Sequence, residues 1–163
     1  MRAGELHGAG KTTDELAAEL AQLGADLLVR TLPTLADGSA VWTEQDEALV
    51  THAAKVTKAE MRLDPSMSAH ACVSRVLASS DAAPARCVLA GKPVRIMAAA
   101  EAAPDAPALA AADVAVASGR VWLGCADGTF ELCAVKPDGK RAMEASAWAA
   151  GQRGASLTWQ ALS

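Results

Sequence analysis

The segment whose residue types most resemble a chemical site is GAGKTT, residues 8–13. A P-loop binds phosphates with backbone amides and a lysine at a helix start, and it follows a hydrophobic strand. The pattern requires a glycine five positions before Gly10, but that position holds Glu5, and Gly4 lies one place too early. The preceding residues, MRAGELH, are not a hydrophobic strand. We therefore interpret the segment as a polar helix entry and not as a nucleotide site.

The histidines give no support for nucleophilic catalysis. None of His7, His52 and His70 stands in a recognisable local pattern with a serine or cysteine, although an activated nucleophile needs an adjacent base. The neighbouring acids Asp46 and Glu47 lie in a polar stretch that is typical of a solvated surface. We predict no catalytic residue in this chain.

The four cysteines indicate a reduced protein without a metal site. They form no C-x-x-C pair, and no histidine follows them at zinc-ligand spacing. Cys87, Cys125 and Cys133 lie in apolar runs, which predicts small buried side chains. The N-terminus lacks the apolar core of a signal peptide, and no apolar run approaches the ~20 residues of a membrane span. These features predict a cytoplasmic protein with no membrane contact.

The basic residues are more informative, although the formal net charge is −4. Residues 1–50 hold three basic and nine acidic side chains, whereas residues 51–163 hold twelve and ten. The turn KPDGKR, residues 136–141, presents Lys136, Lys140 and Arg141, and a second hairpin presents Lys92 and Arg95. Turns of this kind suit phosphate contacts. The chemistry of the residues alone leaves two interpretations open, a polyanion-binding face and ordinary surface solubility.

A long amphipathic helix is predicted near the N-terminus. Thr12 and Glu15 form a capping box, and the helix should run from about Thr13 to Thr31 or Leu32, where Pro33 interrupts it. One face carries a leucine stripe at helical spacing, made of Leu16, Leu20, Leu23 and Leu27. Such a stripe needs a partner, either the rest of the chain or a second copy of it.

Residues 39–56 show no period and predict an ordered, extended linker. Thr57 and Glu60 then repeat the capping-box pattern and predict a short helix that ends before Pro65. Ser66 or Ser68 caps a further helix to about Ala78, with Val73, Val76 and Leu77 facing inward.

From residue 86 onward the pattern changes to short β-type runs separated by turns. The predicted strands are 87–90, 94–99, 114–117, 121–125, 129–135 and 157–162, with a helix at 142–150 that stops at Gly151. Ala/Pro-rich residues 101–112 predict a loop, and Asp127-Gly128 a tight hairpin turn. Five or six short strands with one helix before the last predict a mixed, mainly β fold, a small OB-like antiparallel barrel.

Three segments together resemble one known family. In residues 31–64, a leucine–turn–glycine precedes Gln-Asp-Glu at 45–47, Thr-x-Ala-x-Lys at 51–55, Thr-Lys-x-Glu at 57–60 and an acid at 64. VKPDGKRAMEASAWAAG at 135–151 is similar to the family's C-terminal turn, methionine and short helix, and GKPVRI at 91–96 to its first hairpin. With order and spacing kept over residues 12–151, the chain resembles the C-terminal part of methionyl-tRNA formyltransferases. The family's Asn-Pro-Trp-Pro-like loop is replaced here by SSDAAP, residues 79–84.

The resemblance implies a division of the chain. Residues 1–40 correspond to the last helix of a truncated catalytic domain, residues 41–64 to the interdomain linker, and residues 65–163 to the OB-like C-terminal barrel. The family's catalytic and folate-binding residues lie upstream and find no match here. We therefore expect no bound cofactor, since 10-formyltetrahydrofolate would bind the absent N-terminal domain, and no activity from this chain alone.

The resemblance also implies a partner. The family formylates initiator methionyl-tRNA, and its barrel assists in binding that tRNA. Lys136, Lys140 and Arg141 match the family's turn by position and are the expected tRNA contacts, together with Lys92 and Arg95. An alternative is a stand-alone, non-catalytic interaction module derived from this family. Separately, self-association through the leucine stripe is expected as a further contact of the chain.

Overall fold

The computed structural model describes residues 10–152 and 157–162. The chain divides into two compact units, residues 1–55 and residues 56–163, which we describe separately. His7 and the first two residues of GAGKTT lie outside the described residues. Across the described part of the chain, no helix combines the length and the apolar character that crossing a membrane requires.

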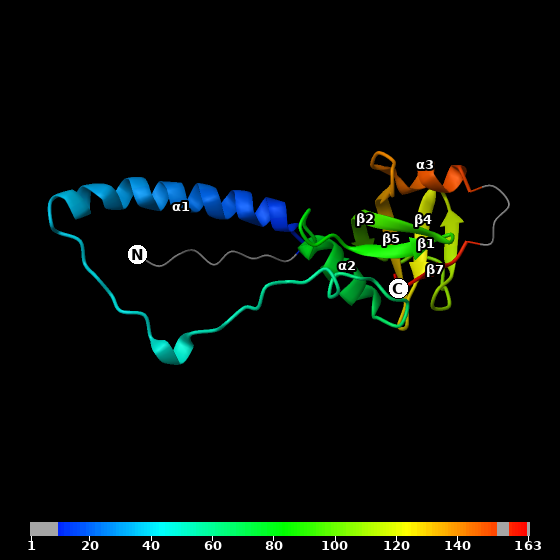
Figure 1. Cartoon of the computed structure of the whole chain (residues 1–163), viewed down its shortest axis with the longest axis horizontal. Helices are drawn as coiled ribbons and strands as arrows, with labels where there is room; N and C mark the ends of the chain where they lie inside the picture. Colours follow the sequence, from blue (N-terminus) through cyan, green and yellow to red (C-terminus); the bar gives the residue numbers. More distant parts are fainter. Residues whose placement is uncertain (1–9, 153–156, 163) are drawn as a thin grey trace. The chain divides into compact units, whose positions relative to one another are not determined.

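The first unit contains one long helix, α1, at Thr13–Ala36 (Figure 1). The predicted capping box is confirmed: the Thr12 backbone N–H donates to Glu15 Oε2 at 2.8 Å, and the Glu15 N–H donates to Thr12 Oγ1 at 3.3 Å. The predicted end at residue 31 or 32 is wrong, because Pro33 lies inside the helix. At this position proline removes only one hydrogen bond of the last turn. The Asp37 N–H donates to the Pro33 carbonyl at 3.0 Å and completes the helix end.

The segment after α1 is extended, as predicted, apart from one 3₁₀ turn. This turn, η1, spans Glu47–Leu49, and Asp46 caps it by accepting a hydrogen bond from the Ala48 N–H at 2.9 Å. An aspartate side chain offers this local bond readily. Asp46 therefore has a local structural role as the cap of η1.

The second unit begins with a turn where a short helix was predicted. The capping bonds do form, with the Thr57 N–H donating to Glu60 Oε2 at 2.7 Å. No helix forms there, because Met61 and Leu63 are buried and the chain here pairs with the sheet. The Leu63 N–H donates to the Arg86 carbonyl at 2.9 Å. Tertiary pairing thus overrides the local helix signal.

Helix α2 at Ala69–Ala78 supplies one side of the barrel core. Ser68 caps it, accepting from the Ala71 N–H at 3.1 Å. Val73 and Val76 are buried as predicted, and Leu77 is half-buried against the core. Cys72 is buried as well, which was not predicted from the sequence. The other cysteines follow the prediction only in part.

Cys87 and Cys125 are fully buried, whereas Cys133 is half-buried. The Cys125 thiol lies 3.7 Å from that of Cys72. Desolvation raises the pKa of Cys87 to about 12. Cys87 is therefore a neutral, apolar core side chain at ordinary pH, which is the behaviour of a structural and not a reactive cysteine.

The barrel is one antiparallel sheet in the order β3-β4-β5-β2-β1-β7, with β6 paired to β5. Its elements, in chain order, are β1 Arg86–Leu89, β2 Lys92–Glu101, β3 Val114–Ala117, β4 Arg120–Gly124, β5 Thr129–Pro137, β6 Met143–Glu144, α3 Ala145–Ala150 and β7 Trp159–Gln160. Strand β2 is longer than predicted, and a register irregularity around Met97 lets it pair along much of β5. The predicted helix at 142–150 loses its first turn because Met143 and Glu144 pair with β5.

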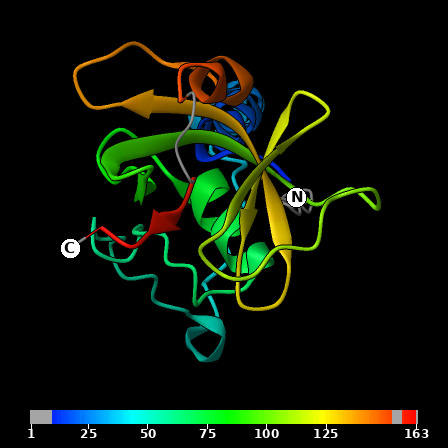
Figure 2. The same cartoon turned by 90° about the vertical axis from the view of Figure 1, so that its right-hand side faces the viewer.

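Strand β7 brings the two ends of the sheet together. It pairs with β1, and an isolated bridge joins Thr158 to Asp113, just before β3. The Trp159 N–H donates to the Ala112 carbonyl at 2.9 Å. The sheet is therefore a nearly closed barrel, with α3 over one side of it and α2 behind its strands (Figure 2). The predicted mainly β, OB-like barrel preceded by a helix is confirmed.

Candidate nucleic-acid interface

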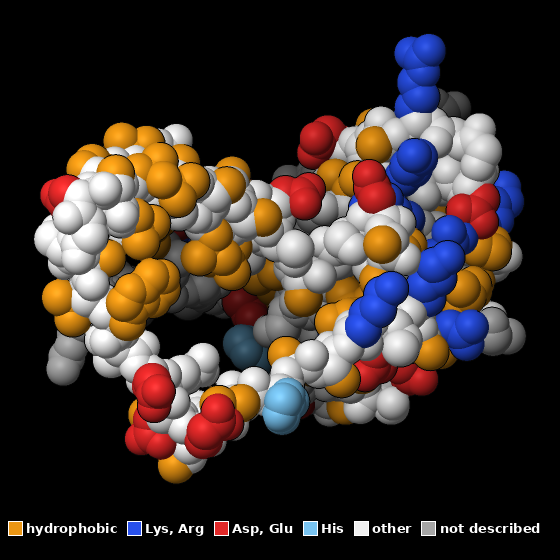
Figure 3. Space-filling model, turned by 60° about the vertical axis from the view of Figure 1, so that its left-hand side comes forward, with side chains coloured by type: hydrophobic (Ala, Val, Ile, Leu, Met, Phe, Trp, Pro, Cys, Tyr) orange, Lys and Arg blue, Asp and Glu red, His pale blue; other side chains and the backbone are white. Residues whose placement is uncertain are grey.

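Four basic residues lie side by side across the sheet. Arg62 pairs with Arg86, Arg86 with Arg95, and Arg95 with Lys136. Residues directly opposite each other on paired strands project to the same face. We call these four residues the basic row. Figure 3 shows Lys and Arg side chains gathered in a line over one face of the barrel unit.

The β1–β2 turn fixes the register of the row. Ala90 and Gly91 both have positive φ, 49° and 73°, as a two-residue type I′ hairpin turn requires. Leu89 then pairs with Lys92, and counting outward along the strands pairs Arg86 with Arg95. The turn residues therefore position two arginines that are nine residues apart in the chain.

The two central arginines are engaged by carboxylates. Arg86 Nη2 donates to both oxygens of Asp138 at 2.7 Å, and Arg95 Nη1 donates to Asp81 Oδ1 at 2.7 Å. The hydrogen bond from Arg95, together with its charge, holds the pKa of Asp81 below its ordinary value. Asp81 stays ionised at neutral pH and competes with any phosphate for Arg95.

The other predicted contacts carry free positive charge. Lys136, Lys92, Lys140 and Arg141 are exposed, and in the described residues none of the four makes an ion pair or a side-chain hydrogen bond. The predicted turn at residues 137–139 forms, with the Lys140 N–H donating to the Pro137 carbonyl at 3.0 Å. Exposed basic side chains without an ion-pair partner can exchange water for phosphate oxygens.

The structure brings the five predicted tRNA contacts into two places and not into one site. Arg95 and Lys136 are neighbours in the basic row. Lys92 and Lys140 line one pocket, and Arg141 follows Lys140 without lining it. Arg62 and Arg86 were not among the residues predicted from the sequence. The β1–β2 hairpin turn could have predicted Arg86, because the turn determines which residue lies opposite Arg95. Arg62 could not have been predicted in this way, because it joins the row through a contact between segments that are distant in the sequence.

One histidine has a serine neighbour in the fold, a spatial pairing that the local sequence pattern had left open. His70 Nδ1 lies 2.9 Å from Glu101 Oε1, and Ser74 Oγ lies 3.5 Å from His70 Nε2. The His70 side chain is 81% exposed, and the serine contact is at the limit of a hydrogen bond. The arrangement is a solvated surface group that lacks the enclosed surroundings of a catalytic base. Within the described ranges, no three His, Cys, Asp or Glu side chains gather where they could hold a metal ion.

A small, nearly closed β-barrel with a basic face belongs to the OB-like class, whose members include oligonucleotide-binding barrels. Comparison with known families narrows this class. The family model described as formyl transferase, C-terminal domain, matches residues 55–153. The chain belongs to the formyl transferase C-terminal domain family, and the family predicted from the sequence is confirmed.

Individual relatives agree with this assignment. The chain is 34% identical over 148 residues to the methionyl-tRNA formyltransferase of Corynebacterium jeikeium, covering 90% of this chain and 45% of that protein. It is 36% identical over 145 residues to that of Halorhodospira halophila, covering 89% and 47%. The corresponding values for Methylococcus capsulatus are 36% over 140 residues, 85% and 44%. The chain therefore spans about half the length of the curated relatives it matches.

Proposed function

We propose that this chain helps to hold initiator methionyl-tRNA for formyl transfer from 10-formyltetrahydrofolate. The observation that carries the proposal is the basic row with the free lysines beside it. In this proposal the folate and the catalytic groups belong to a separate formyltransferase domain, so the barrel contributes binding and orientation only. The site of action would be the cytoplasm, where translation is initiated.

The test measures the affinity of the chain for purified initiator tRNA by fluorescence anisotropy at several salt concentrations. Each phosphate neutralised by a lysine or arginine releases condensed counterions, so affinity falls with salt. For about four phosphate contacts, affinity should fall roughly 100-fold between 50 and 200 mM salt. Absence of binding at 50 mM salt would refute the proposal.

Freeing Arg95 should strengthen tRNA binding. Asp81 is 96% exposed, so the substitution Asp81→Asn removes a competing carboxylate at little cost in stability. We expect tRNA affinity to rise by about threefold to tenfold at low salt. The control is Asp105→Asn, which makes the same charge change at an acid paired with Arg120, outside the basic row. Equal gains in the two variants would show that only net charge matters.

A second candidate function, a self-associating interaction module, is favoured by α1. No residue of α1 is buried. In the stripe Leu20 is 49% exposed and the other three leucines are half-buried, while Leu28 and Leu32 outside it are 58% and 51% exposed. Leu16, Leu20, Leu23 and Leu27 follow the alternating four- and three-residue spacing of a coiled-coil seam. We propose that a second copy of α1 covers this stripe.

The stripe predicts a concentration-dependent dimer in sedimentation velocity. Leu20→Glu together with Leu27→Glu should shift the chain to monomer, because two charges would lie in the seam. The matched control is Ala17→Glu with Ala25→Glu, which adds the same charge elsewhere on α1. A wild-type monomer at all concentrations would contradict this second candidate.

A further inference from the structure

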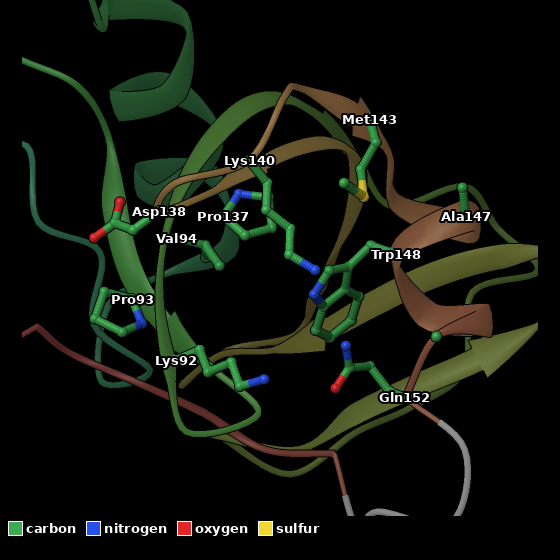
Figure 4. Close-up of a pocket in the computed structure, with 11 residues that line it drawn as sticks. Lys92, Pro93, Val94, Pro137, Asp138, Lys140, Met143, Ala147, Trp148 and Gln152 are labelled. Carbon is green, nitrogen blue, oxygen red and sulfur yellow. The ribbon is translucent and has the colours of Figure 1, made fainter.

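A pocket lies beside the basic row, between the start of β2, the β5–β6 loop and α3. Its volume is about 580 Å³, within the range of small-molecule sites. Figure 4 shows its lining, in which Val94, Pro137 and Met143 are apolar and Lys92, Lys140 and Gln152 are polar. The indole of Trp148 forms one wall.

The Trp148 indole offers the pocket an N–H donor that makes no hydrogen bond to another described residue. The residue as a whole is only 6% exposed, but its ring nitrogen is not among the fully buried nitrogens that lack a partner, which in the described residues are Arg86 Nε and Arg95 Nε. By contrast, the buried indole of Trp159 donates to the Gly124 carbonyl at 2.9 Å. The Trp148 N–H is therefore open to water, and a ligand acceptor can replace that water. In Figure 4 the Trp148 ring nitrogen faces the pocket, which places this donor where a bound ligand would lie.

Three further side chains of the pocket also carry N–H donors. The side chains of Lys92, Lys140 and Gln152 extend toward the indole (Figure 4). One carboxylate, that of Asp138, lines the pocket as well, but both of its oxygens accept from Arg86 at 2.7 Å. The charge available to a ligand is therefore positive. Two ammonium groups and an indole N–H together fit the oxygens of a phosphate.

The apolar lining adds a second requirement. Met143 and Val94 offer surface that a bare phosphate would leave uncovered, and a thioether packs well against aromatic rings. A phosphate linked through a sugar to a planar base satisfies both halves of the pocket. We infer that this pocket binds one nucleotide of an RNA strand, with the phosphate at Lys92, Lys140 and Trp148 and the base against Met143. The inference rests on the proposed tRNA function for the source of that nucleotide.

The experiment follows the Trp148 indole N–H resonance in ¹⁵N–¹H spectra of the full chain. The Trp148→Phe variant assigns the resonance. We expect adenosine monophosphate to shift it, with adenosine binding about tenfold more weakly because it lacks the phosphate. Initiator tRNA should shift the same resonance and displace the mononucleotide. Binding of the mononucleotide without displacement by tRNA would identify a free-nucleotide site and overturn the RNA assignment.

Matched variants test the geometry. Lys140→Ala should weaken binding of adenosine monophosphate by about tenfold. Lys58→Ala, which removes an exposed lysine of the same unit that does not line the pocket, should leave it unchanged. Equal effects in the two variants, or no shift of the Trp148 resonance by any of the probes, would overturn the inference. If tRNA still binds with the expected salt dependence while that resonance stays still, the pocket inference fails and the proposed function stands.

Discussion

The substitution Gly124→Ala is expected to lower the free energy of unfolding by about 3 kcal/mol or more, the upper end of what overpacking costs. A Cβ at this position would lie 2.0 Å from the Ala110 carbonyl oxygen. That oxygen is backbone and cannot turn aside as a flexible side chain could. Urea unfolding followed by tryptophan fluorescence measures the effect, as a lower midpoint at unchanged slope.

The neighbouring backbone cannot yield, because Gly124 is held on both sides. Its N–H donates to the Asp113 carbonyl at 2.9 Å, and its carbonyl accepts from the Ala112 N–H at 3.1 Å. The same carbonyl accepts the Trp159 indole N–H at 2.9 Å, which links β4 to β7. A shift that made room for a methyl group would break these bonds at the point where the barrel closes.

Gly128→Ala is the matched control. Gly128 lies in the loop between β4 and β5, and an added Cβ there meets nothing within 4 Å. Its effect should stay within about 0.5 kcal/mol, as for most surface substitutions. If the Gly124 variant were as stable as this control, the close approach of residues 110 and 124 would be absent from the folded protein in solution.

Local signals predicted the fold where no distant segment competed with them. The capping box at Thr12 and Glu15 starts α1, and the same pattern at Thr57 and Glu60 forms its hydrogen bonds but starts no helix. The two segments differ in the residues that come after the cap. Leu63 is fully buried and its backbone pairs with Arg86, so tertiary contacts decide the conformation. The sequence of residues 57–63 alone does not predict the pairing with Arg86.

The candidate site was predictable residue by residue but not as an arrangement. The charged turn at residues 136–141 and the hairpin around Gly91 each identify basic side chains from sequence alone. Their adjacency depends on pairing of β2 with β5, which places Arg95 opposite Lys136 across 41 positions of chain. The approach of Asp81 to Arg95 likewise follows from the folded loop, and so does the position of Trp148 in the pocket that Lys92 and Lys140 line.

The second large effect is expected for the paired substitution Lys136→Glu and Arg141→Glu. Both side chains are exposed and make no direct ion pair with a described residue, so we expect the barrel to stay folded in this variant. Each should remove a phosphate contact and add repulsion, and together they should weaken tRNA binding roughly 100-fold at low salt. Neither residue lines the pocket, which leaves the inferred nucleotide site intact.

The salt dependence separates a local contact from a general charge effect. Losing two phosphate contacts should reduce the slope of log affinity against log salt by about two. The control is Lys11→Glu with Arg30→Glu, which makes the same change in net charge within the first unit. If that control weakened tRNA affinity and reduced the salt slope equally, tRNA binding would depend on the overall charge of the chain and not on the basic face of the barrel. A loss confined to the barrel variant would instead show that tRNA affinity depends on the basic face itself. Lys136 lies in the basic row only because β5 pairs with β2, so the strand pairing that builds the row would also set its affinity for tRNA.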